Sequence, residues 1–181
     1  MNRQVGPSIA LSVSIVCFFA VALFRHDPRP RTAHGTEKQA FRGDIGHPVL
    51  VVNTASFCGY TPQYRDLEAL WQKYRDRGLV VVGVPSNDFG AQEPGSAAEI
   101  KSFCETNYAI DFPLTEKYRV IGDSAHPFYR WVAETLGEGA APRWNFHKYL
   151  IDPDGELAGA WPSSVRPGDP AITGKIDKML G

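Results

Sequence analysis

The stretch HPVLVVNTASFCGYTP, residues 47–62, is expected to determine how this chain folds. Its apolar, β-branched run ends in small polar residues, which predicts a buried strand over residues 47–56. Thr61 and Pro62 then predict a helix start, with Thr61 as the N-cap and Pro62 at the first helical position. Gly78 is expected to end that helix, and LVVVGVPS (79–86) follows as a second buried strand. A strand, a helix and a strand joined by short links predict a right-handed unit with parallel strands.

The rest of the chain continues the alternation of helices and strands. Ser96 and Glu99 form a capping box that is expected to open a helix running to about Thr106. Asp152-Pro153-Asp154-Gly155 predicts a hairpin turn. The other predicted elements are a helix over 126–136, antiparallel strands over 146–151 and 156–161, and a last helix capped by Asp169-Pro170. This order predicts an α/β domain of thioredoxin-like fold, with a mixed central sheet and helices on both faces.

The N-terminal segment is expected to lie outside the folded domain. No residue from Gln4 to Phe24 is charged, and an apolar run of about 20 residues is long enough to span a bilayer as a helix. Residues 1–25 therefore predict a membrane anchor or a signal segment, with the uncleaved anchor preferred and Ala20-Val21-Ala22 as the alternative cleavage site. Positive charges flank the run on both sides, so the sequence leaves open which side of the membrane the domain faces. Residues 26–37 are predicted to be a linker, and residues 38–181 the folded domain.

Composition and charge narrow the class of function. The chain is 43% hydrophobic and 22% charged, as in ordinary globular domains, and its net charge of −1 gives no reason to expect a nucleic-acid partner. The three cysteines, Cys17, Cys58 and Cys104, are too few for a disulfide framework and are not spaced as zinc ligands. We therefore expect no metal and no bound cofactor, and His126 and His147 are interpreted as structural residues.

Cys58 lies at the predicted turn between the first strand and its helix. A helix N-terminus presents unpaired N–H groups and a partial positive charge, which stabilise a thiolate. A free cysteine is only about 3% thiolate at pH 7, and one helix end contributes only about 0.3–1 kcal/mol. Hydrogen bonds to a charged group contribute about 1.5–3 kcal/mol each, so a reactive Cys58 is expected to have one or two further donors nearby. The alternative interpretation is a buried, inert cysteine.

Three segments together resemble the glutathione peroxidase family. They are NTASFCGYT (53–61), VPSNDFGAQEPGS (84–96) and RWNFHKYL (143–150), and they occur in the order and at the spacing of that family. The resemblance runs from about Val49 to the end of the chain. It implies a thiol-dependent peroxidase with a catalytic tetrad at Cys58, Gln92, Trp144 and Asn145. The amide and indole N–H groups of the last three are neutral donors that could hold a thiolate without titrating.

The resemblance also implies a resolving cysteine at Cys104. In the implied cycle, Cys58 reduces hydrogen peroxide or an organic or lipid hydroperoxide and becomes a sulfenic acid. Cys104 then condenses with it to a disulfide, and thioredoxin or glutathione restores both thiols. The chain departs from the family at Asp88, whose charge could oppose thiolate formation, and at Ser86, which replaces a frequent cysteine. The segment before Val49 also matches poorly.

Two other functions share some of these residues. A peroxide sensor or thiol relay would use the same cysteines to pass a disulfide to a partner protein. A copper-binding protein of thioredoxin fold would need a second cysteine near Cys58, where the chain has Thr61. The chain is short before Arg143, where tetrameric members of the family have an insertion, so we expect a monomer.

Overall fold

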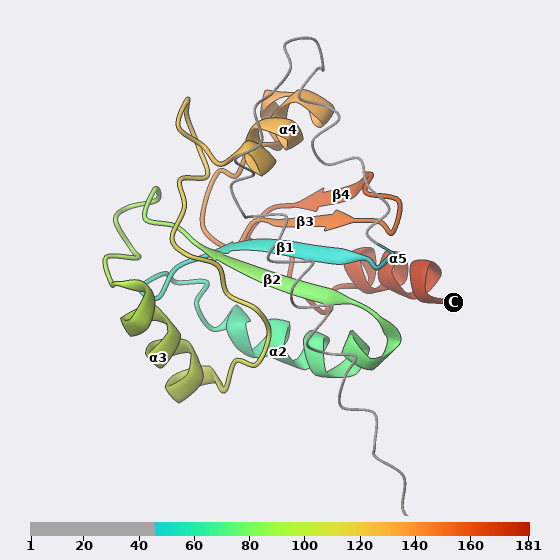
Figure 1. Cartoon of the computed structure of the whole chain (residues 1–181), viewed down its shortest axis with the longest axis horizontal. Coiled ribbons are helices and arrows are strands. Elements are labelled where there is room, and N and C mark those ends of the chain that lie inside the picture. The colour runs from blue at the N-terminus through green and yellow to red at the C-terminus, as the bar shows by residue number, and fades with distance from the viewer. Residues whose placement is uncertain (1–45) are drawn as a thin grey trace, which may run out of the picture.

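The fold is organised around a four-stranded mixed sheet. The computed structural model describes residues 46–181, and the strands lie in the order β2-β1-β3-β4 (Figure 1). β1 (Val49–Thr54) pairs in parallel with β2 (Val80–Pro85) and antiparallel with β3 (Lys148–Ile151), which forms a hairpin with β4 (Leu157–Trp161). The helices are α2 (Gln63–Tyr74), α3 (Ala97–Tyr108), α4 (Pro127–Leu136) and α5 (Pro170–Leu180), with 3-10 turns at Arg75–Arg77 and Glu138–Ala140.

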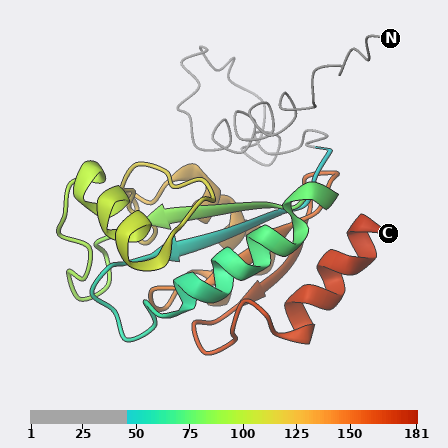
Figure 2. The same ribbon diagram turned by 90° about the horizontal axis from the view of Figure 1, so that it is seen from below.

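The sheet carries a hydrophobic core on each face. β1 is buried along its whole length, as expected of a central strand that is covered on both sides. Leu50 and Val52 pack in one cluster with residues of α2, α3 and α5, whereas Val49 and Val51 pack in a second cluster with residues of α4. Figure 2 shows α2 and α5 covering the same face, which leaves α4 on the other. The mixed sheet with helices on both faces, predicted from the sequence, is confirmed.

The start of α2 differs from the prediction. Pro62, not Thr61, occupies the N-cap position, and no side chain caps the helix there. The Thr61 hydroxyl instead donates to Ala55 O at 2.9 Å and accepts from Cys58 N at 3.0 Å. Thr61 therefore folds back over the turn before the helix, and the predicted N-cap role is wrong.

The observed ends of other helices and strands differ from the predicted ends by a few residues. The α-helix α2 ends at Tyr74, and its 3-10 extension is closed by Gly78 with a φ of 109°. The capping box of Ser96 and Glu99 opens α3 as predicted, and the helix continues to Tyr108. β3 begins at Lys148, after Phe146, whose left-handed backbone with a φ of 63° lies outside the β region.

The predicted anchor or signal at 1–25, the linker at 26–37 and Cys17 lie outside the described residues. Within residues 46–181, none of the helices combines the length and the apolar character needed to cross a membrane.

Candidate active site

Cys58 lies in the turn that connects β1 to α2, at the carboxyl end of the central strand. Its side chain is only 7% exposed, so the thiol is more enclosed than a loop position suggests. The backbone N–H of Tyr60 points at Cys58 Sγ at 3.4 Å, and Thr61 N donates to Cys58 O at 3.0 Å. The turn therefore directs an N–H group at the sulfur, in the manner expected at the start of a helix.

Gln92 and Asn145 are brought together at this turn. Asn145 Nδ2 donates to Gln92 Oε1 at 2.9 Å, although 53 residues separate the two in the chain. Phe57 N, next to Cys58, donates to Gln92 O at 3.1 Å, so the loop that carries Gln92 is tied directly to the cysteine turn. Asn145 Oδ1 is buried and makes no hydrogen bond within residues 46–181.

Asn53, the next-to-last residue of β1, holds the loop that carries Trp144 and Asn145. Its Nδ2 donates to Trp144 O and its Oδ1 accepts from His147 N, both at 3.0 Å. Its own carbonyl accepts from Phe146 N at 2.6 Å. Sequence reasoning missed this role, because Asn53 stands with Thr54 at the polar end of an apolar run and its complete burial is visible only in the structure.

Trp144, the fourth residue of the predicted set, lies at the protein surface. Its side chain is 39% exposed and packs on Phe89 with the ring centroids 5.8 Å apart. Two further aromatic side chains beside Cys58 are also exposed, Phe57 at 66% and Tyr60 at 37%. Exposed aromatic side chains thus lie directly beside Cys58 in the chain, at Phe57 and Tyr60.

Asp88 departs from the family pattern, and its charge could have opposed a thiolate at Cys58. In the structure its carboxylate binds the loop at 119–121. Its Oδ2 accepts from Val120 N at 2.6 Å and from Ile121 N at 3.3 Å, and its Oδ1 lies 3.5 Å from Arg119 Nε. The carboxylate therefore anchors the loop at 119–121. An Asp at this position is accommodated by donors that the sequence could not reveal.

Cys104 is completely buried in α3, and it and Cys58 are both free thiols. Burial is the main cause that raises the pKa of Cys104 to about 11. The Tyr64 hydroxyl lies beside it and partly opposes that effect, whereas the charge of Glu93 adds to it. In this conformation Cys104 is a thiol held in the core, not a nucleophile at the surface.

The two histidines have the structural roles that the sequence suggested. His126 is the N-cap of α4, where its Nδ1 accepts from Phe128 N at 3.3 Å. His147 stacks on Tyr149 with the ring centroids 4.8 Å apart. Burial is the main cause that lowers the pKa of His147 to about 4, so its ring is neutral at pH 7.

Comparison with known proteins identifies the family of the chain. The family model described as glutathione peroxidase matches residues 26–133, more than half of the chain. The hydroperoxy fatty acid reductase gpx1 of Synechocystis sp. is 43% identical over 149 residues, which cover 78% of this chain and 87% of that protein. The glutathione peroxidase-like peroxiredoxin gpx1 of Schizosaccharomyces pombe is 47% identical over 124 residues, covering 67% of this chain and 78% of that protein.

Solved structures agree with the sequence matches. The crystal structure of T. cruzi GPX1 superposes with a TM-score of 0.59 at 34% identity, covering 75% of this chain and 83% of that one. A thiol:disulfide interchange protein of the thioredoxin family from Chlorobium tepidum superposes with a TM-score of 0.53 over 86% of this chain and 100% of that one, and at 18% identity it bears on the fold alone. The thioredoxin-like fold predicted from the sequence is confirmed. The chain belongs to the glutathione peroxidase family.

Proposed function

We propose that Cys58 reduces hydroperoxides, with Gln92, Trp144 and Asn145 as the donors that assist it. The chain is a peroxidase of the glutathione peroxidase family, and the proposal concerns the roles of these four residues. The hydrogen bond between Asn145 and Gln92, on a loop tied to Phe57, is the observation that carries the proposal. It joins two predicted donors, far apart in sequence, beside the predicted nucleophile.

The reaction follows from the groups present. The Cys58 thiolate attacks the terminal oxygen of the peroxide, the O–O bond breaks, and the departing oxygen takes up a proton from solvent and leaves as alcohol or water. Sulfur is oxidised to a sulfenic acid and the peroxide is reduced. Neutral donors suit this step because they stabilise charge on sulfur and on the departing oxygen without changing their own protonation.

The proposed second step joins Cys104 to Cys58. The Cys104 thiol condenses with the sulfenic acid, a disulfide forms and water leaves. Since Cys104 is fully buried, α3 must open before the sulfurs can meet. Two features of α3 favour local opening: only Ile100 and Cys104 of its residues are buried, and a cavity of about 460 Å³ lies between the helix and residues 110–116. The helix also lies close to the cysteine turn, because the rings of Phe57 and Phe103 are 6.1 Å apart.

A coupled assay tests both steps and the reductant. Peroxide-dependent NADPH consumption would be measured with thioredoxin and its reductase, and in parallel with glutathione and its reductase. We expect turnover with thioredoxin that Cys58→Ser and Cys104→Ser both abolish. Turnover with glutathione that survives Cys104→Ser would remove the resolving role and keep the peroxidase. No turnover with either reductant would favour the relay that passes its disulfide to a specific partner.

The exposed aromatic side chains beside Cys58 support the proposal that lipid hydroperoxides are among the substrates. Phe57 and Tyr60, close to Cys58 in the chain, are 66% and 37% exposed, and an acyl chain would bury part of their apolar surface. A relative is named as a hydroperoxy fatty acid reductase. We expect a higher kcat/KM for linoleic acid hydroperoxide than for hydrogen peroxide, and a Phe57→Ser variant that loses the difference. Equal values for the two peroxides in the wild type would contradict this preference.

Membrane association is proposed from the N-terminal sequence alone. The uncharged stretch from Gln4 to Phe24 is the only support for it, and it would bring the peroxidase close to lipid substrates. Fractionation of cells that express the full chain tests the proposal, because an anchored protein sediments with membranes and is released by detergent but not by high salt. Recovery of the full chain in the soluble fraction would contradict it.

A further inference from the structure

Lys148 is a buried amine in a strand where an apolar residue would be expected. It is the first residue of β3, and its side chain has no exposed surface. Within residues 46–181 no carboxylate lies at ion-pair distance; the charge of Asp66 on α2 acts on it from further away. Burial, only partly offset by Asp66, lowers the pKa of Lys148 to about 7. Placing an amine here carries a desolvation cost that an apolar side chain would avoid.

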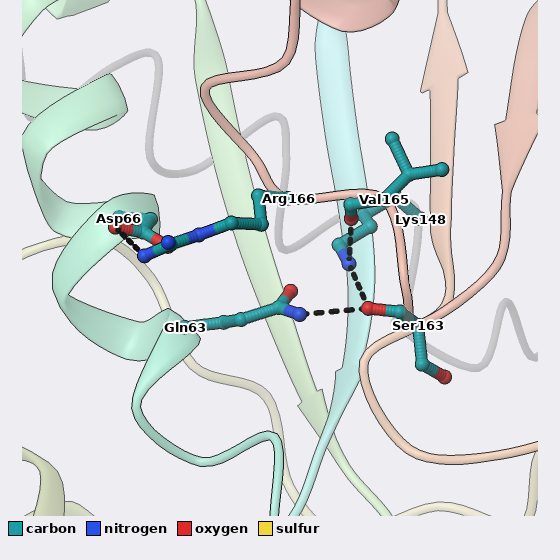
Figure 3. A network of polar contacts seen from close by, with 6 residues as sticks. All are labelled: Gln63, Asp66, Lys148, Ser163, Val165 and Arg166. Atoms are coloured by element: carbon teal, nitrogen blue, oxygen red, sulfur yellow. Dashed lines mark hydrogen bonds and ion pairs between the residues drawn. The ribbon is translucent and has the colours of Figure 1, made fainter.

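The Lys148 amine hydrogen-bonds to two backbone carbonyls of the segment at 163–165. Nζ donates to Val165 O at 2.6 Å and to Ser163 O at 3.3 Å (Figure 3). Gln63 Nε2 reaches Ser163 O from α2 at 2.7 Å. One carbonyl is thus fixed from the sheet and from the helix at once, and the segment around Ser163 has little freedom to shift.

The fixed segment in turn holds Asn145. Ser163 Oγ donates to Asn145 O at 2.6 Å, and Ser163 is only 7% exposed. In the same loop, Asn53 Nδ2 donates to Trp144 O, and the Asn53 backbone carbonyl accepts from Phe146 N. The Asn145 peptide is therefore held between two buried side chains, and its amide is left to bond Gln92.

We propose that Lys148 and Ser163 are positioning residues for peroxide reduction, which act by fixing the Asn145 peptide so that the Asn145 amide faces the cysteine turn. The proposal rests on the role proposed above for Asn145. Neither residue touches the reacting atoms; their effect is on geometry, and small displacements of a catalytic group lower rates strongly.

Single-turnover kinetics of the full chain test this proposal. Reduced protein is mixed with hydrogen peroxide and the second-order rate constant of oxidation is measured, while reduction of the oxidised protein by a dithiol is measured separately. The variants are Asn145→Ala, Ser163→Ala, Ser163→Thr, Lys148→Met and the double variant Ser163→Ala/Asn145→Ala. Arg166→Met is the matched control, because Arg166 lies in the same segment but binds Asp66 at 2.8 Å at its outer end (Figure 3).

We expect Ser163→Ala to slow oxidation about 10-fold with little effect on reduction by the dithiol. Ser163→Thr should restore the rate because it keeps the hydroxyl, Arg166→Met should match the wild type, and the double variant should be no slower than Asn145→Ala. Additive losses in the double variant, or equal slowing of both half-reactions, would overturn the proposal. If Asn145→Ala is slow but Ser163→Ala and Lys148→Met match the wild type, only this inference fails. If Asn145→Ala matches the wild type, the proposed role of Asn145 fails first.

Discussion

The hydroxyl of Thr61 offers a direct test of how the cysteine turn is held. Thr61→Val keeps the shape of the side chain and removes one oxygen. That oxygen accepts from Cys58 N at 3.0 Å and donates to Ala55 O at 2.9 Å. Thr61, Ala55 and Cys58 are all buried, so water cannot easily replace the lost partner.

The size of the effect follows from the two hydrogen bonds. A buried group left without its partner costs about 1–3 kcal/mol. Two such groups are left here, so we expect the free energy of unfolding to fall by about 2–6 kcal/mol, a large share of the about 5–15 kcal/mol typical of a domain. The rate constant for oxidation by peroxide should fall as well, because the turn that directs the Tyr60 N–H at the sulfur loses a brace.

Urea unfolding of the full chain measures this change, with the slope of the transition used to check that the unfolded state is unaltered. Thr173→Val is the matched control. The Thr173 hydroxyl bonds Asp169 O at 3.2 Å within α5, where the residue is only half-buried, and we expect a loss below about 0.5 kcal/mol. A Thr61→Val protein as stable as the Thr173→Val protein would refute the reasoning.

Three further predictions concern other parts of the site. Asp88→Asn should lower the free energy of unfolding by about 1–2 kcal/mol and leave the rate of oxidation by peroxide unchanged, because the carboxylate binds backbone N–H groups at 120 and 121; faster oxidation would show that its charge does reach the nucleophile. Ser96→Ala removes the cap of α3, so it should destabilise the helix by about 1 kcal/mol and raise the rate at which Cys104 forms its disulfide, measured by the mass shift after quenching; a slower rate would mean that the helix need not open. His147 has a folded-state pKa of about 4, below the about 6.5 of an unfolded chain, so the unfolded state binds more protons between these values and stability falls as pH falls through this window. Between pH 7 and pH 5 the wild type should lose about 2 kcal/mol more than His147→Gln, and parallel losses in urea unfolding would contradict this.

The sequence predicted the parts of the site that depend on local pattern. The position of Cys58 after a buried strand, the capping box of α3 and the Asp169 cap of α5 follow from short-range rules, and all three are observed. Each of these features is set by residues within a few positions of one another.

The parts that were missed depend on contacts between distant segments. Thr61 has the residue type of an N-cap, but the carbonyl of Ala55 and the N–H of Cys58 compete for its hydroxyl. The clamp made by Asn53 spans 91 residues to Trp144. No local rule distinguishes a buried asparagine that holds a remote loop from one that ends a strand, and the same is true of Lys148.

Phe146 connects the candidate active site to the hydrophobic core, so substitutions in the core can affect the site. It is a bulky residue in the left-handed backbone region, directly after Asn145, and such a conformation costs about 1–3 kcal/mol. The ring is fully buried and meets Tyr64 edge-on with the centroids 5.2 Å apart. Packing in the core therefore stabilises the left-handed backbone of Phe146. A substitution at Tyr64, deep in the interior, would therefore release the bend that follows Asn145. Variation among the large core side chains of this protein should then tune peroxide reactivity as well as stability.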